Sequence, residues 1–396
     1  MRLSSFGFAA SAVVLVGCTH LSNPSPATTS AAITPHDLEV RLTALADDST
    51  MGREAGTIWN TKATDWVALQ FRELGLRPMG ENGTYFQSVP NIRVRDTAVT
   101  RGDARNVIAV IEGSDPSLRG EYVSITAHND HVGFTHRPLD HDSVRAFNTV
   151  IRPLGADSRA HPPSPEEATQ IRAILDSLRR IRAPRPDSVN NGADDDGSGT
   201  AALIELAEAF AKGNAKPKRS ILFVSHTAEE KGLLGSAWYT DHATVPIDSI
   251  VAEIDVDMIG RGAARDLPAG GPTYLEVVGL RRLSSEFGDW LEGVNATEPL
   301  PFVFNYEYDA PGHPNQYYCR ADHYSYARFG IPSVSLSRGE HMDYHQLTDE
   351  VQYIDFPDYA RLTQLVYDAA LYVANADHRP RLSVPKPTNP HIPCKQ

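Results

Sequence analysis

The sequence predicts an α/β fold in which helices cover both faces of a largely parallel sheet. Short apolar runs, typical of buried strands, alternate along the chain with stretches of helical periodicity. Acidic and imidazole side chains follow several of these runs, at the carboxyl ends of strands, where ligands of such sheets collect. With 396 residues and 41% hydrophobic content, the chain can bury a full core.

The N-terminus resembles a bacterial lipoprotein signal. The apolar stretch 6–16 is too short to anchor stably in a bilayer and has the size of a signal-peptide core. Leu15-Val16-Gly17-Cys18 resembles a lipobox, so we expect removal of residues 1–17 and lipidation of Cys18; an ordinary signal peptide with an incidental cysteine is the alternative. Thr19 stands where an aspartate would favour inner-membrane retention. We therefore expect an exported protein of the bacterial envelope, lipid-anchored in the outer membrane and facing the periplasm.

One folded domain is expected over residues 36–378. Residues 18–35 are small, polar and proline-bearing, as in a flexible tether, and the tail 379–396 is too rich in proline to form a helix. Apolar side chains from Trp59 to Leu74 predict a first helix that ends near Gly75. The expected strands are 107–111, 122–126, 221–225, 250–256, 274–278 and 333–336, and the later helices are 199–212, 233–239, 284–291 and 357–374.

Residues 137–189 interrupt this alternation of strands and helices. Ser164 can cap a helix, Pro165 fits its first position, and Glu167 can close a capping box. The apolar side chains that follow form one stripe: Ile171, Ile174, Leu175, Leu178 and Ile181. We expect an inserted hairpin or lid that shapes the substrate site, with a plain surface excursion as the alternative.

Charge and cysteine content narrow the possible partners. The net charge of −13 and the pI near 5.6 argue against nucleic acid as a partner, because phosphate binding needs a basic surface. Cys319 and Cys394 could pair in an exported chain, but the sequence also allows free thiols. The oligomeric state stays open.

Two motifs combine an imidazole with a nearby carboxylate. In the run AHNDH, His128 ends a strand, and Asp130 two residues later can orient the ring. In the second motif His345 follows the phenol of Tyr344, with Asp349 as a possible orienting group.

Three further motifs are acidic. Asp195 is the middle one of three adjacent aspartates before a helix; their repulsion is costly unless a cation neutralises them, and a solvated acidic turn is the alternative. Glu229 and Glu230 stand at a strand–helix junction and point in different directions, so one can bind a metal while the other faces the substrate. Asp257 ends another strand. Together these motifs predict ligands for two divalent ions and one carboxylate left to move protons.

Six ordered motifs resemble those of the co-catalytic zinc aminopeptidases of metallopeptidase family 28 (clan MH): AHNDH, GADDDGSGTAALIELA, TAEEKGLLGS, DVDMIGR, ADHYSYARFGIPS and DYHQLTDE. The resemblance covers about residues 38–375 and implies a three-layer α/β/α domain around a mixed eight-stranded sheet, with two Zn²⁺ ions. The implied ligands are His128 and Asp257 for one ion, Glu230 and His345 for the other, and Asp195 as the bridge. Glu229 matches the general base and Tyr344 the phenol that stabilises the oxyanion.

Three residues depart from the family pattern. Asp196 replaces the asparagine usual after the bridging aspartate, Asp255 replaces another asparagine, and Ala321 replaces a common serine. None of these changes removes a ligand, and the extra charge of Asp196 could tighten metal binding.

The expected function is that of a zinc aminopeptidase that removes N-terminal residues from peptide substrates. Glu229 would act as general base for a dizinc-bound hydroxide, and the acidic cavity would attract the free amino group. One alternative is a carboxypeptidase or dipeptidase that grips a carboxylate with Arg261, Arg320 or Arg338. Another is a glutaminyl-cyclase-like transferase, which resembles this scaffold with a single zinc. A non-catalytic binding lipoprotein is disfavoured, because binding alone needs neither Glu229 nor Tyr344.

Overall fold

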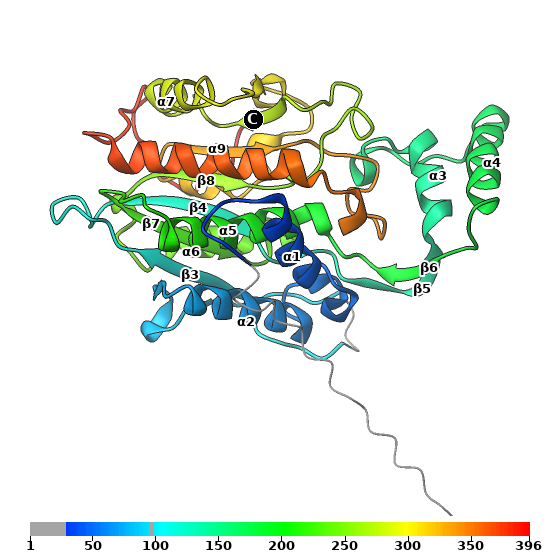
Figure 1. Ribbon diagram of the computed structural model, residues 1–396, viewed down its shortest axis with the longest axis horizontal. Coiled ribbons are helices and arrows are strands. Elements are labelled where there is room, and N and C mark those ends of the chain that lie inside the picture. The colour runs from blue at the N-terminus through cyan, green and yellow to red at the C-terminus, as the bar shows by residue number, and fades with distance from the viewer. Residues whose placement is uncertain (1–28, 96–98) are drawn as a thin grey trace, which may run out of the picture.

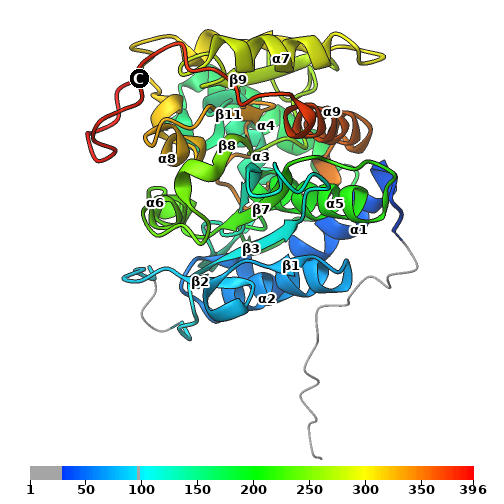
Figure 2. The ribbon, with the colours of Figure 1, turned by 90° about the vertical axis from the view of Figure 1, so that its left-hand side faces the viewer.

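A mixed sheet runs through the centre of the molecule (Figure 2). The computed structural model describes residues 29–95 and 99–396. Within them the sheet has nine strands, in the order β1-β3-β7-β4-β8-β11-β9-β10, with β2 also paired with β3. The strands are β1 (Arg77–Pro78), β2 (Phe86–Ser88), β3 (Arg105–Ile111), β4 (Tyr122–His128), β7 (Ser220–His226), β8 (Ile250–Val256), β9 (Tyr274–Val278), β10 (Val303–Asn305) and β11 (Ser333–Ser337).

The expected mixed, largely parallel sheet is confirmed, but it has nine strands where eight were expected. β1 and β2 both pair with β3, through Val110 and Val107 respectively, and so follow each other along one edge of that strand. Nine strands therefore occupy eight positions across the sheet.

Helices cover both faces of the sheet, as expected. The helices are α1 (Pro35–Leu45), α2 (Ile58–Glu73), α3 (His141–Ile151), α4 (Pro165–Arg179), α5 (Gly199–Lys212), α6 (Leu234–Asp241), α7 (Ser285–Asn295), α8 (His323–Ala327) and α9 (Phe356–Asn375). Apolar side chains of α1, α2, α5, α7 and α9 join the larger core, while α6 and α8 contribute to a smaller core on the opposite face (Figure 2). In residues 29–95 and 99–396, no helix is long and apolar enough to cross a bilayer.

The four central strands, β7, β4, β8 and β11, are parallel, so their carboxyl ends meet at one edge of the sheet. Their side chains are almost all buried on both faces, including polar ones such as Glu253 and Asp255 of β8. His128 ends β4 beside His226 of β7, and Asp257 directly follows β8. The site described below forms at this edge.

Most of the expected elements are present within a few residues of their predicted ends. The six expected strands are β3, β4, β7, β8, β9 and β11, and the later helices are α5, α6, α7 and α9. Helix α2 is followed by Gly75 with φ +77°, a left-handed conformation that suits glycine. The capping box of Ser164 and Glu167 at the start of α4 is also confirmed. Helices α1, α3 and α8, four short strands (β1, β2, β10 and residues 186–189) and the longer strand at 134–140 were not predicted.

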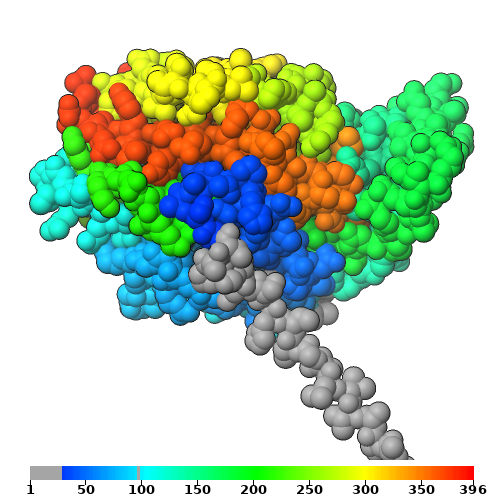
Figure 3. All heavy atoms as spheres, in the orientation of Figure 1, coloured from blue at the N-terminus to red at the C-terminus, as the bar shows by residue number. Residues whose placement is uncertain are grey.

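Residues 134–189 form an arm that projects from one end of the domain (Figures 1 and 3). β5 (Phe134–Asp140) and β6 (Pro186–Val189) pair as an antiparallel ribbon, and α3 and α4 pack together beyond it. The carboxylate of Asp142 is fully buried and accepts hydrogen bonds from Arg179, Arg182 and Arg185, which clamps α4 to α3. The predicted apolar stripe of α4 is only partly covered, and Ile181 is 75% exposed.

The described part of the chain begins at Thr29, shortly before α1. The expected signal peptide 1–17 and Cys18 lie outside the described residues, as does the tether up to residue 28. Thr34 caps α1. At the other end, the tail 379–396 forms no helix, and a disulfide between Cys319 and Cys394 fastens it to the domain.

Candidate metal centre

His128 and Asp257 approach each other from neighbouring parallel strands. The Nε2 atom of His128 lies 3.2 Å from Asp195 Oδ1 and 3.6 Å from Asp257 Oδ1. Its Nδ1 atom lies 3.0 Å from the backbone carbonyl oxygen of Asp130. A proton on Nδ1 satisfies that carbonyl and leaves the Nε2 lone pair facing the two carboxylates. We call this group of three side chains the first position.

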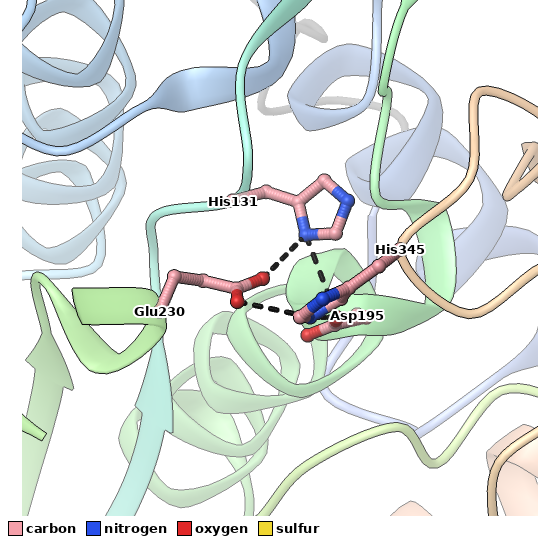
Figure 4. A group of neighbouring side chains, drawn as sticks. All are labelled: His131, Asp195, Glu230 and His345. Carbon is pink, nitrogen blue, oxygen red and sulfur yellow. Dashed lines mark ion pairs between the residues drawn. The ribbon is translucent and has the colours of Figure 1, made fainter. Parts of the chain in front are cut away.

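Asp195 also belongs to a second group, with Glu230, His345 and His131, which converge from different segments (Figure 4). The Nε2 atom of His345 lies 2.9 Å from Asp195 Oδ2 and 2.9 Å from Glu230 Oε2. The Nδ1 atom of His131 lies 2.9 Å from Glu230 Oε1 and 3.5 Å from Asp195 Oδ2. One donor atom from each residue lies within 4.8 Å of the others. We call this group the second position.

The donor atoms of both positions fit a divalent cation. Four of them are buried without a hydrogen-bond partner among the described residues: His131 Nδ1, Asp195 Oδ2, Glu230 Oε1 and Asp257 Oδ1. Buried polar atoms are normally paired. Imidazole nitrogens of the second position lie 2.9 Å from carboxylate oxygens, yet the atoms in question do not form hydrogen bonds. Such close approach is expected when the lone pairs of both atoms point at a common ion. Nitrogen and carboxylate donors at this spacing suit zinc.

The sequence model of peptidase family M28 matches residues 106–370, more than half of the 396-residue chain. The chain belongs to peptidase family M28. Leucine aminopeptidase 1 of Ajellomyces dermatitidis is 34% identical over 197 residues, which are 47% of this chain and 48% of that protein. The chain therefore spans about half the length of the leucine aminopeptidases it matches.

Solved structures share the fold. A leucine aminopeptidase precursor from Bacteroides thetaiotaomicron superposes with a TM-score of 0.56 at 16% identity, over 86% of this chain and 97% of that one. A glutaminyl cyclase of the same organism gives 0.55 at 16% identity, over 86% and 98%. A Zn-dependent exopeptidase from Parabacteroides distasonis gives 0.53 at 18% identity, over 86% and 98%. These similarities confirm the architecture, and the two candidate ligand groups agree with the zinc dependence of family M28.

Asp196, which departs from the family pattern, supports the backbone around the first position. Its carboxylate accepts the N–H groups of His128 at 3.0 Å, Gly199 at 2.8 Å and Met258 at 3.2 Å. These bonds join the ends of β4 and β8 to the start of α5. Although Asp196 lies within ligand distance of His128 and Asp257, three N–H donors already occupy its oxygens. The first position therefore relies on Asp195 and Asp257 for its carboxylates.

The carboxylate of Asp130 does not orient the His128 ring, contrary to expectation. Its Oδ1 atom is 3.8 Å from His128 Nδ1 and instead accepts the backbone N–H of Glu229 at 3.1 Å. The backbone carbonyl of Asp130 takes the ring proton, so the residue acts through its main chain.

Asp349 also acts elsewhere than expected. Its carboxylate oxygens accept the backbone N–H groups of Asp194, at 3.0 and 3.1 Å, and of Asp195, at 3.0 Å. It was expected to orient the ring of His345. The structure shows that it fixes the backbone that carries Asp195, the residue common to both positions.

A cavity opens beside the two positions. Its wall includes Glu229 and Tyr344 as well as three of the candidate ligands, Asp195, Asp257 and His345. Glu229 faces this cavity while the adjacent Glu230 contacts His131 and His345, so the two carboxylates diverge as predicted. The remaining lining residues are Met258, Glu276, Val278, Tyr317, Arg320, Ala321, Ser335, Ser337 and Glu340.

The charges around the second position are strongly coupled. Burial opposes ionisation of Asp195, yet the imidazoles of His131, His128 and His345 hold its pKa well below its usual range. Burial would also lower the pKa of His345, but Asp195 and Glu230 raise it to about 11. Burial, Asp195 and Glu230 raise the pKa of Tyr344 well above 10, so this phenol keeps its proton at neutral pH.

The base of the arm contacts the loop that carries Tyr344 and His345. The N–H of Ala156 donates to the carbonyl of Tyr344 at 3.0 Å, and Asn148 donates to the carbonyl of Met342 at 3.0 Å. The guanidinium of Arg320 joins Asp157 of the arm, at 2.8 Å, to the hydroxyl of Tyr344, at 3.4 Å. The insertion therefore supports the loop that carries Tyr344 and His345 from outside, since none of its own residues lines the cavity.

Proposed function

We propose that the chain is a zinc-dependent aminopeptidase that binds two Zn²⁺ ions and removes N-terminal residues from peptides. The observation that carries this proposal is the pair of buried ligand groups that share Asp195 and open on a cavity with Glu229 and Tyr344. The proposed ligands are His128 and Asp257 for one ion, Glu230 and His345 for the other, and Asp195 for both. When bound, the ions would supply Lewis-acid chemistry, polarising the scissile carbonyl and lowering the pKa of water.

Glu229 is placed to move the proton. Its side chain faces the cavity and has no role in either ligand group, while its backbone N–H is fixed by Asp130 at 3.1 Å. A carboxylate held there takes a proton from the attacking water and returns it to the leaving amine.

Tyr344 is placed to stabilise the oxyanion. Its hydroxyl accepts a hydrogen bond from Arg320 at 3.4 Å and retains its own proton for donation. A fixed donor directed at developing negative charge lowers the barrier without further reorganisation.

The cavity favours a substrate amino group over a substrate carboxylate. Of the three arginines considered for gripping a carboxylate, Arg261 is fully buried against Asp343 and Asp266, and Arg338 is buried as well. Only Arg320 lines the cavity, and Asp157 already neutralises it. The remaining charged side chains of the wall are mostly carboxylates, which attract an ammonium group.

The glutaminyl-cyclase alternative has less support. The resemblance of cyclases to this scaffold involves a single zinc, whereas this chain gathers two ligand groups. A transferase of that kind would cyclise N-terminal glutamine and would not release amino acids.

Hydrolysis assays on the purified protein test the proposal. We expect cleavage of aminoacyl anilides with a free amino group, loss of cleavage after chelation, and recovery with Zn²⁺. N-acetylated versions of the same substrates should be resistant. Equal cleavage of acetylated peptides from their carboxyl end would support a carboxypeptidase, and cyclisation of N-terminal glutamine without hydrolysis would support the transferase.

We also propose that the enzyme is exported and lipid-anchored through Cys18. The lipobox-like sequence before Cys18 supports this, and the disulfide between Cys319 and Cys394 suits an oxidising compartment. In a bacterial host, Cys18→Ser should move the protein from the membrane fraction to the soluble periplasmic fraction. Retention of that variant in the membrane would contradict the anchor.

A further inference from the structure

The side chain of His131 is buried at the second position but makes no hydrogen bond within the described part of the chain. Its side chain is fully covered, and neither ring nitrogen has a hydrogen-bond partner among the described residues. An imidazole buried without partners loses the hydrogen bonds it makes with water, a cost that structures normally avoid. Its Nδ1 atom points at Glu230 and Asp195, the two carboxylates that also face His345 (Figure 4).

The protein holds this ring firmly in place. The neighbouring Asn129 is fixed by Asn60 at 2.9 Å and by Ser225 at 3.1 Å, and the backbone N–H of His131 donates to Arg53. On the other side stands Gly192, with φ +55°; a Cβ atom there would lie only 2.5 Å from the His131 ring. The absence of a side chain at residue 192 leaves room for the imidazole.

We propose that His131 Nδ1 is a further protein ligand at the second position, an inference that rests on the dizinc proposal above. The second position then has four protein donors, two imidazole nitrogens and two carboxylate oxygens, whereas the first has three. Four protein donors are typical of zinc sites that hold their ion permanently, while three leave a place for water or substrate. The two positions are therefore unequal: the second retains its ion, and the first exchanges its ion more readily.

The alternative role for His131 is a hydrogen-bond donor that orients Glu230. Substitutions at residue 131 separate the two roles, because Asp and Asn both place an atom where Nδ1 stands. In His131→Asp that atom is a carboxylate oxygen, which can bind a metal but cannot donate. In His131→Asn it can be an amide nitrogen, which can donate but is a poor ligand.

Metal binding itself provides the measurement. Apo-protein is titrated with Zn²⁺ alone against a chromophoric chelator, and the visible spectrum of the first bound equivalent of Co²⁺ is recorded. For the wild type we expect two ions of clearly different affinity. His131→Asn should weaken the tighter ion by more than 100-fold, beyond the roughly 10- to 100-fold that loss of an outer partner costs. His131→Asp should stay within about tenfold of the wild type, and both variants should change the Co²⁺ spectrum.

The inference would be overturned if His131→Asp weakened the tighter ion more than His131→Asn does. Zinc binding like that of the wild type in both variants would overturn it as well. In those cases, two ions in the wild type would leave the aminopeptidase proposal intact. A wild type that binds no zinc would overturn both proposals. His242→Asn, at an exposed histidine outside both positions, serves as the control and should bind both ions as the wild type does.

Discussion

The carboxylates of the cavity wall predict a preference for substrates whose first side chain is positively charged. Glu276 and Glu340 line the cavity and are only 4% and 8% exposed. Arg320 is the arginine of that wall, and it is already paired with Asp157 at 2.8 Å. A lysine or arginine side chain of the substrate would pair with Glu340 when that acid is ionised, because Asp157 already neutralises most of the charge of Arg320.

Glu340→Gln tests this preference with little change in shape. A hydrogen bond to a charged group contributes about 1.5–3 kcal/mol, and 1.4 kcal/mol corresponds to a factor of ten. We therefore expect kcat/KM for a lysyl anilide to fall about 10- to 100-fold. For a leucyl anilide it should change less than about twofold. Glu307→Gln, at an exposed acid outside the cavity, should alter neither substrate.

The pH dependence of the lysyl preference gives a second measure. Burial and the nearby Asp157 raise the pKa of Glu340 to about 7, against the lowering effects of Tyr317 and Arg320. The carboxylate is ionised above that pH, so the ratio of lysyl to leucyl kcat/KM should rise between about pH 6 and 8 in the wild type. In Glu340→Gln the ratio should stay flat. A wild type that prefers leucine, or a variant that loses both activities equally, would refute the reasoning.

Three other perturbations have definite expected outcomes. Glu229→Gln should keep its zinc, measured by elemental analysis, while kcat falls about 10²- to 10⁴-fold, because a general base is lost and no ligand is; unchanged turnover would remove Glu229 from the mechanism. Removal of zinc by a chelator should lower Tm, and added Zn²⁺ should restore it, because free Zn²⁺ at 1,000 times its Kd stabilises the folded protein by about 4 kcal/mol. A Tm that does not respond to zinc would contradict the metal centre. Burial favours a neutral Asp142, but hydrogen bonds from Arg182 and Arg185 hold its pKa at about 2, below the usual 3.8, so the carboxylate adds about 2 kcal/mol of stability. That contribution is present above about pH 4 and is lost as the pH falls towards 2, so denaturant titrations of Asp142→Asn and the wild type should differ at pH 7 and converge at low pH.

The parts of the fold that the sequence predicted are those with an unambiguous apolar pattern. β8 was predicted with its observed ends, because five of its seven residues are apolar and all seven are buried. Helix α3 was missed because the residues it buries are largely polar, including His141 and Asp142. Its burial becomes favourable only through Arg179 of α4 and through Arg182 and Arg185 after that helix, and periodicity does not show such distant contacts. β5 was missed because most of its side chains are exposed.

The sequence predicted most residues of the candidate site but not the hydrogen bonds that orient them. The order of motifs placed His128 and Asp257 at strand ends and Asp195 before a helix, and the structure brings the three together as expected. The sequence could not show that a backbone carbonyl orients His128, because main-chain contacts leave no residue pattern. It also passed over His131, although a second imidazole three residues after His128 in the same motif was a usable signal.

The number of acidic residues does not by itself locate the metal centre. Burial and repulsion from Asp255 raise the pKa of Glu253 well above its usual value, burial and Asp322 raise that of Asp255, and the hydroxyl of Thr126 bonds both carboxyl groups. Asp195 is equally buried, but three imidazoles hold it in its charged form. Ionised carboxylates are therefore found where histidines lie close to them. A cation binds where the lone pairs of these carboxylates and imidazoles converge from several directions. The Nδ1 atom of His131 lies as close to Glu230 as the Nε2 atom of His345 does, at 2.9 Å, so imidazoles as well as carboxylates distinguish the metal centre from the other buried acids.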